Sequence, residues 1–327
     1  MNSGKFVISL DFELYWGVRD SKSLDQYGEN IKGVHNVIPK LLGLFSKYNI
    51  RATFSTVGLL FFENKQALLA GLPEQIPAYT DKAFSPYEAQ FEDIGNSFED
   101  DPYHYGAHLV KLIQKYPEQE IGSHTFSHYY CLEKGQTVAD FKADLIAAKK
   151  IAQQLGINFT SIIFPRNQFN NEYLDVCKGL GIICYRGNEL SSIYKATPSK
   201  DRTFLLRSLR VADAYINISG QNCYSDEYMK SGDLVNIPAS RFLRPYSKKL
   251  EFFDAMKLRR IKSGMTYAAK NNLTYHLWWH PHNFGINQDK NFSLLKKILD
   301  HYQELRNKYN FENYTMSGLA NKLRTSI

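Results

Sequence analysis

Lys5-Phe-Val-Ile-Ser-Leu-Asp11-Phe-Glu13-Leu-Tyr-Trp-Gly17 opens with an apolar run and carries two carboxylates where that run ends. The run fits a buried β-strand, whose side chains alternate between two faces, so Asp11 and Glu13 are expected to point the same way. Two carboxylates at the end of a buried strand are costly unless a cation or hydrogen-bond donors compensate them. The stretch predicts a strand that delivers an acidic pair to a site, although a capping Asp and a solvated Glu would also fit this spacing.

Further apolar runs alternate with helical patterns along the chain. We expect strands at 5–11, 50–57, 119–123, 161–165, 182–186, 204–209, 234–238 and 273–280. We expect helices at 34–48, 138–155, 171–180 and 251–271. Gly156 and Gly181 follow two of these helices, where a helix should stop. Such alternation is typical of repeated β/α units.

Two imidazoles follow the third expected strand, in Ile121-Gly-Ser-His124-Thr-Phe-Ser-His128. On a helical turn, side chains at this spacing share one face and can bind one divalent cation through a ring nitrogen each. Histidine pairs of this kind also occur by chance on helix surfaces. Together with one carboxylate of the acidic pair, however, they make a three-ligand set with a position open for water, which is typical of catalytic zinc.

Two more expected strands end in polar clusters. One reads Ile162-Ile-Phe-Pro-Arg166-Asn167-Gln, and the other reads Tyr275-His-Leu-Trp278-Trp279-His280-Pro-His282-Asn. If the strands lie parallel around one axis, all these clusters meet at the carboxyl ends, where the chemistry of β/α barrels collects. A strand-end arginine that faces solvent is the alternative for Arg166, and the core is the alternative for either tryptophan.

In the order of these four motifs the chain resembles the polysaccharide deacetylase superfamily (NodB homology, carbohydrate esterase family 4). The resemblance covers nearly the whole chain and implies an α/β fold, a distorted, incomplete (β/α)7-type barrel formed by a single domain over residues 1–327. Residues 72–118, rich in Pro, Tyr and acidic side chains, fit it least. We expect them to form an insertion that covers the active site, because a long excursion of this kind is usually functional or disordered.

The resemblance also implies roles for the acidic pair and the arginine. Asp11 matches the catalytic base, and Glu13 matches a metal ligand beside His124 and His128. The family's acidic motif usually has two adjacent aspartates, so the division of roles between Asp11 and Glu13 stays open. Arg166 matches the arginine that pairs with the base, although here a proline precedes the arginine instead of following it. A guanidinium there would keep Asp11 ionised.

His280 matches the family's terminal histidine, the acid that protonates the leaving amine, and His282 is its competitor. A histidine suits this task because its ordinary pKa lies near neutrality. A carboxylate that orients His280 is expected, and the sequence does not rank its candidates. These candidates are Asp213, Asp226 and Asp233. Substrate contacts are expected from Trp278, Trp279, His282 and Asn167.

The activity that the resemblance implies is metal-dependent removal of an N-acyl group, most simply N-acetyl, from an amino sugar or glycan precursor, with Zn²⁺ as the expected ion. A deformylase or a cyclic amide or ureide hydrolase of the same superfamily is an alternative, as is a catalytically silent sugar-binding relative. A metal-dependent glycosidase is a further alternative, but it would need two carboxylates that flank the scissile bond.

Composition and charge fit an enzyme with a sizeable core. The 327 residues are 43% hydrophobic, and the net charge of +7 is unevenly spread. The stretch 241–262 is strongly basic, which favours a nucleotide sugar, a polyprenyl-phosphate sugar or a membrane face as partner, or simply a solvated helix face. No nucleic-acid-binding motif accompanies the charge. No signal peptide or membrane span is visible, so we expect a cytoplasmic protein with reduced cysteines.

Overall fold

The computed structural model describes residues 3–87, 90–198 and 203–325. Its strands form one sheet, and every strand pairing is parallel. The strands are β1 (Lys5–Phe12), β2 (Thr53–Thr56), β3 (Glu120–Ser123), β4 (Ser161–Ile162), β5 (Cys184–Tyr185), β6 (Val235–Asn236), β7 (Arg241–Phe242), β8 (Thr274–Trp279) and β9 (Glu312–Tyr314). Their order is β6-β5-β4-β3-β2-β1-β8-β7, and β9 also pairs with β1.

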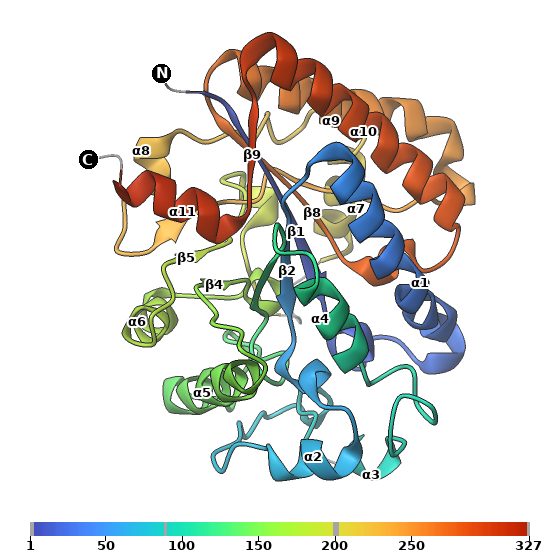
Figure 1. Ribbon diagram of the computed structural model, residues 1–327, viewed down its shortest axis with the longest axis vertical. Coiled ribbons are helices and arrows are strands. Elements are labelled where there is room, and N and C mark those ends of the chain that lie inside the picture. Colours follow the sequence, from blue (N-terminus) through green and yellow to red (C-terminus); the bar gives the residue numbers. More distant parts are fainter. Residues whose placement is uncertain (1–2, 88–89, 199–202, 326–327) are drawn as a thin grey trace.

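Helices pack around this sheet, with α1, α9 and α10 on one side and α5 and α6 on another (Figure 1). They are α1 (Leu24–Tyr48), α2 (Lys65–Ala70), α3 (Gln90–Asp93), α4 (Ala107–Gln114), α5 (Val138–Gln154), α6 (Asn171–Gly179), α7 (Phe204–Asp213), α8 (Asp226–Met229), α9 (Asp254–Lys270), α10 (Gln288–Tyr309) and α11 (Met316–Thr325). Short 3-10 turns follow strands β1, β4 and β8 as η1 (Leu14–Gly17), η4 (Pro165–Asn167) and η8 (Pro281–Phe284). None of the helices in the described ranges could cross a membrane.

The sheet curls into a barrel that strand pairing among the described residues does not close. Its two edges, β6 and β7, are consecutive in the chain and joined by residues 237–240. A linker of this length spans at most about 18 Å, so the edges must lie close together. The linker bridges them, since Ile237 N–H donates to Tyr185 O and Ser240 N–H donates to His276 O, both at 2.9 Å. The expected incomplete α/β barrel is confirmed.

One expected strand is wrong, and two strands were not foreseen. The run 204–209 lies in helix α7, which begins after Thr203, whose side chain caps it. Phe204 and Leu205 at its start are 85% and 67% exposed, so the run is not a core strand. A short apolar run fits either element, and periodicity alone does not separate them. The unforeseen strands β7 and β9 are too short to give a periodic signal.

The segment 72–118 packs against the turn that follows β1. Trp16 Nε1 donates to His104 O at 2.9 Å, and Tyr15 N–H donates to Tyr103 O at 3.1 Å. Helix α4 at its end lies against α1. The segment therefore supports η1 from behind, and its described residues are absent from the lining of the cavity at the carboxyl ends of the strands. The cover that we expected it to give that cavity is not seen, and the division into domain and insertion stays a prediction.

Candidate active site

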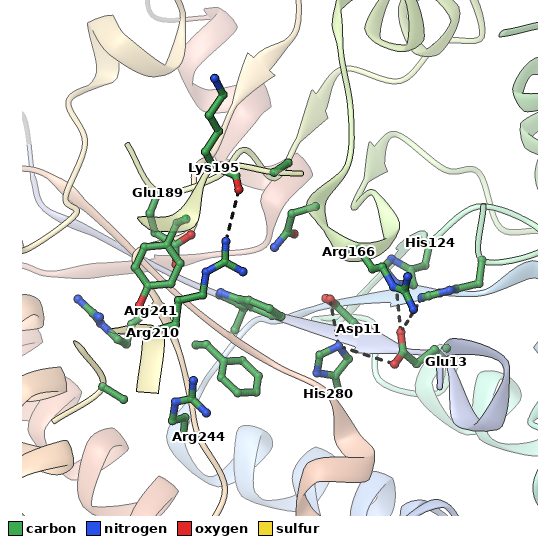
Figure 2. A pocket seen from close by; sticks show the side chains of 18 residues that line it. Asp11, Glu13, His124, Arg166, Glu189, Lys195, Arg210, Arg241, Arg244 and His280 are labelled. Atoms are coloured by element: carbon green, nitrogen blue, oxygen red, sulfur yellow. Dashed lines mark hydrogen bonds and ion pairs between the residues drawn. The ribbon is translucent and has the colours of Figure 1, made fainter. Parts of the chain in front are cut away.

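The acidic pair lies at the carboxyl end of β1. Asp11 is in the strand and Glu13 follows it, and each is 3% exposed. Asp11 Oδ2 and Glu13 Oε1 both lie 3.7 Å from His280 Nε2 (Figure 2). The chain then folds back over Glu13, because a Cβ at Gly17 would come within 2.0–2.4 Å of the Glu13 carboxyl atoms. Only glycine fits there, so η1 is shaped around this carboxylate.

Arg186, at the end of β5, holds Asp11 by two parallel bonds. Its Nη1 lies 2.7 Å from Asp11 Oδ1 and its Nη2 lies 2.8 Å from Oδ2, and the guanidinium sits 4.1 Å above the Trp278 ring. Burial raises the pKa of the Asp11 carboxyl. The charge of Arg186, the charges of two nearby histidines and the Arg186 hydrogen bonds together outweigh burial, so the pKa falls below its ordinary value. Sequence reasoning missed Arg186. The only signal was its place at the end of an expected strand.

The expected contact between Arg166 and Asp11 is wrong. Arg166 lies in η4 with a φ of 54°, and this left-handed turn directs its guanidinium to Asp20, with which it forms an ion pair, and to the Tyr130 ring at 4.4 Å. The next residue, Asn167, does contact Arg186, the partner of Asp11: Asn167 Oδ1 accepts a hydrogen bond from Arg186 Nη2 at 3.0 Å. Arg166 and Asn167 line the same cavity.

His124 and His128 meet Glu13 on one oxygen. Their Nε2 atoms lie 3.3 Å and 3.1 Å from Glu13 Oε2, and all three side chains are buried. His124 Nδ1 lies 2.8 Å from the Ile163 carbonyl, so it carries the proton and leaves the Nε2 lone pair facing the site. Burial lowers the pKa of His128 to about 4, which keeps the ring neutral. This donor set fits a divalent cation.

The expected helical turn between these histidines is wrong. Residues 124–130 form a loop in which Thr125 and His128 have φ angles of 63° and 59°. Asp144 of α5 fixes the loop, since its carboxylate accepts the N–H groups of Phe126 at 2.6 Å and Ser127 at 3.1 Å. Sequence reasoning also missed Asp144. A carboxylate on the buried face of an expected helix was the signal.

His280 is oriented by an amide instead of the expected carboxylate. Its Nδ1 lies 3.2 Å from Asn283 Oδ1, and the backbone N–H of His280 donates to the same oxygen at 3.3 Å. The three candidate carboxylates bind cations elsewhere. Asp213 pairs with Arg241, Asp226 with Lys5 and Asp233 with Lys178. Burial lowers the pKa of His280 from its ordinary value.

The remaining residues predicted to contact substrate lie in different surroundings. Trp278 lines the cavity beside Arg186. Trp279 points the other way, is fully buried and stacks on Phe284 at 5.6 Å, so its expected contact with substrate is wrong. The alternation of β8 places successive side chains on opposite faces. His282 is 4% exposed and its Nε2 lies 3.3 Å from Glu13 Oε1, so it belongs to the site's inner wall.

The cavity runs from these residues to a second, cationic end (Figure 2). Its volume is about 280 Å³, close to the lower end of the range of ligand pockets. The residues of the cationic end are Lys195, Arg210, Arg241 and Arg244, with Glu189 among them. Burial raises the pKa of Glu189 to about 7, which weakens its negative charge near neutrality. Sequence reasoning placed only Arg241 and Arg244 in a basic stretch.

That basic stretch does not form one docking surface. Arg241, Lys257 and Arg260 are buried, and the first two pair with Asp213 and Asp254. Lys248, Lys249 and Arg259 are exposed. Its cations are therefore divided between structural ion pairs, the cavity and the surface.

Backbone strain gathers around the site. Ten non-glycine residues in the described part of the chain have a positive φ, and six are asparagines, which tolerate it. The other four are Leu14, Thr125, His128 and Arg166. All four belong to the loops that follow β1, β3 and β4. Such strain persists only where the surroundings impose it, which is typical of functional sites.

Comparison with solved structures gives the same fold. A protein from Mycobacterium smegmatis named for the polysaccharide deacetylases is 12% identical with a TM-score of 0.62, over 99% of this chain and 92% of that one. One from Pseudomonas aeruginosa PAO1, named likewise, is 10% identical with a TM-score of 0.55, over 98% and 89%. Puue allantoinase is 9% identical with a TM-score of 0.55, over 98% and 90%. Nothing matches among the curated proteins.

The family comparison is more specific. Residues 27–184 match the model of the polysaccharide deacetylase family. The match includes His124, His128 and Arg166, whereas Asp11 and Arg186 lie outside it. Over these residues the chain is similar to the polysaccharide deacetylase family, and its barrel has the same fold as the solved structures named above.

Proposed function

We propose that this protein is a metal-dependent hydrolase that removes an N-acyl group, most simply acetyl, from an amino sugar or glycan precursor. One observation carries the proposal: Asp11, held ionised by Arg186, lies 3.7 Å from His280 and beside a Glu13, His124 and His128 set that fits a divalent cation. A base, an acid and a cation site around one point are what amide hydrolysis needs.

Asp11 is the proton acceptor in this proposal. Arg186 keeps its carboxylate charged, so it can take a proton from the water whose oxygen attacks the acyl carbon. His280 is the proton donor. Its Nδ1–H is bound to Asn283, so Nε2 is the nitrogen that exchanges a proton with the substrate. As the carbon–nitrogen bond breaks, that proton passes to the departing nitrogen, and the products are a free amine and a carboxylate.

Glu13, His124 and His128 would hold the cation, which supplies polarisation of the acyl oxygen and a lower pKa of water when bound. We assign Glu13 to the cation and Asp11 to the proton because Glu13 meets both histidines, whereas both oxygens of Asp11 are bound by Arg186. Zinc stays a prediction, based on the two imidazoles and one carboxylate.

The cationic end supports an anionic substrate. Arg244 lines the cavity and has no carboxylate or carbonyl partner among the described residues; its guanidinium lies 5.8 Å from the Phe242 ring. Arg210 beside it is bound to the Ile193 carbonyl at 2.6 Å, which aims it without neutralising it. A phosphate on the sugar, from a nucleotide or a polyprenyl carrier, would satisfy these donors while the acyl group reaches the cation site.

Contact with a membrane through residues 241–262 stays a prediction, as does the cytoplasmic location. Phe252 is 89% exposed beside Lys248 and Lys249, a combination that suits an anionic lipid surface. Less Phe252→Ser than wild type should co-sediment with anionic vesicles. Equal binding of the variant and wild type would refute the membrane contact.

The test is metal content together with acyl release. Purified protein should hold a divalent ion and release acetate from N-acetylated sugar nucleotides or lipid-linked sugars, and His124→Ala/His128→Ala should lose both. The control is His35→Ala/His108→Ala, since this second histidine pair lies 3.1 Å apart on α1 and α4, away from the cavity. Folded wild type that never binds a divalent ion would overturn the mechanism, and metal without acetate release would direct the search to formyl or cyclic amide substrates.

A further inference from the structure

Glu13 stands between two pairs of histidines. On one side His124 and His128 face its Oε2. On the other side His282 Nε2 lies 3.3 Å and His280 Nε2 lies 3.7 Å from its Oε1. Within each pair, the ligand atoms of the two histidines and of Glu13 all lie within 4.8 Å of one another. The mechanism proposed above uses the first set for an ion and leaves His282 without a role.

His282 is a buried side chain whose ring nitrogens make no hydrogen bond with the described residues. It is 4% exposed. Its Nε2 is near Glu13 Oε1 but makes no hydrogen bond with it. A buried polar group left unsatisfied destabilises the folded state. A cation between Glu13 and His282 would remove this effect for Nε2.

His280 is in the form that such a cation requires. Its Nδ1 donates to Asn283 Oδ1, so the lone pair of the neutral ring lies on Nε2, toward Glu13 and Asp11. Ligand histidines commonly donate their other ring N–H to an oxygen in this way. The His280 and His282 rings stand nearly perpendicular, with centroids 4.8 Å apart, so both nitrogens approach Glu13 without stacking.

We propose that Glu13, His280 and His282 form a second divalent-cation site, weaker than the first, with Glu13 bridging the two ions. A carboxylate that binds one ion on each oxygen is compatible with the spacing of about 3.5–4 Å found in two-metal hydrolytic sites. Asp11, Glu13 and Arg186 together carry a net charge of −1. One divalent ion would already make the site positive, so a second ion would bind more weakly.

A second ion would compete with the proposed reaction, and the inhibition expected below rests on that proposed function. His280 Nε2 cannot bind an ion and donate a proton at the same time. Occupation of the second site therefore blocks the proton donor, and excess zinc is expected to inhibit acyl release after a first equivalent has supported it.

The test is metal stoichiometry, read independently of activity. Zn²⁺ titrated into wild type and into His35→Ala/His108→Ala should reach two ions per chain, with the second lost first on dialysis. His282→Ala and His282→Gln should each bind one ion, His128→Ala should bind one, and His128→Ala/His282→Ala should bind none, with thermal melting used to confirm that each is folded. Two Co²⁺ ions in wild type should show magnetic coupling through Glu13.

One ion per chain at saturation, unchanged in folded His282→Gln, would overturn the second site. That outcome is separate from failure of the proposed function. Wild type that binds one ion and releases an acyl group keeps the function and loses the second site, whereas wild type that binds two coupled ions without acyl release keeps the site and loses the function.

Discussion

The two ends of the cavity differ in how their charges are used. At the first end the cation Arg186 is matched by Asp11, and Glu13 is enclosed by imidazoles, so the charges fix reactive groups in place. At the second end Arg244 has no acidic partner in the described chain and Arg210 is held by backbone carbonyls. In the proposed function the first end carries the reaction and the second end binds the substrate, so substitutions at the first should change kcat and those at the second should change KM.

The largest effect is expected at the first end. His128→Ala removes a ligand of the predicted cation, whose contribution is several kcal/mol, so kcat/KM for acyl release should fall at least about 10³-fold. The change is measured by acetate release with one equivalent of zinc per chain. Activity within tenfold of wild type in a folded variant would show that the His124–His128 end is not the reactive one.

Substitutions of Arg186 and Arg166 test which of the two arginines supports Asp11. Arg186→Met should lower kcat about 10²-fold, because Asp11 loses the charge that keeps it ionised and serves as the base. Arg166→Met should lower it less than about tenfold, since Arg166 pairs with Asp20. Steady-state kinetics on both folded variants gives the comparison, and equal losses would contradict the assignment of Arg186.

Asp144 tests whether the histidine loop is held from outside the cavity. Asp144→Ala removes the acceptor for two loop N–H groups and the Ser127 hydroxyl, and should weaken zinc binding about 10- to 100-fold. Asp140→Ala is the matched control, because Asp140 lies on the same helix but caps it at Thr137. Competition with a chelator measures both. The same affinity in the two variants would show that Asp144 does not position the loop.

Substitution of Arg244 tests whether the second end of the cavity binds an anionic group of the substrate. Arg244→Gln should raise KM for a phosphate-bearing amino sugar about tenfold and leave kcat unchanged, since one charged hydrogen bond is worth about 1.5–3 kcal/mol. KM for a neutral N-acetylated sugar should not change. Arg259→Gln, at an exposed position of α9, is the control. An equal rise for both substrates would refute an anion site at this end.

The smallest effect concerns Asp213, which supports Arg241 at the second end. Its ion pair and hydrogen bonds outweigh burial and lower its pKa to about 2, below the value of the unfolded chain. A depressed pKa gives stability that is present above about pH 4 and is lost as the pH falls toward 2, by at most about 2 kcal/mol. Between pH 5 and 3, the free energy of unfolding measured with urea should depend less on pH in Asp213→Asn than in wild type. The same slope in both proteins would contradict this contribution of Asp213.

Short motifs made much of the first end predictable. Asp11 and Glu13, the two histidines and His280 each lie within a few residues of an expected strand end, and parallel strands bring such ends together. The same logic failed for Arg166, because proximity to a strand end does not fix direction: one left-handed residue turned it to Asp20. It failed for 204–209 because six residues carry too little periodicity to separate helix from strand.

By itself the sequence determined the β/α alternation, because alternating apolar runs and helical patterns are local features. Its short motifs carried the resemblance to the polysaccharide deacetylases, which implied the incomplete barrel and named the acidic pair and the histidines of the first end. Only the tertiary structure decided that Arg186 holds Asp11, that Asp144 fixes the histidine loop, that Glu13 lies between two histidine pairs, and that Arg210 and Arg244 meet at the second end. These contacts join residues far apart in the chain. Direction and distance between such residues depend on the packing of whole elements, which no short motif contains.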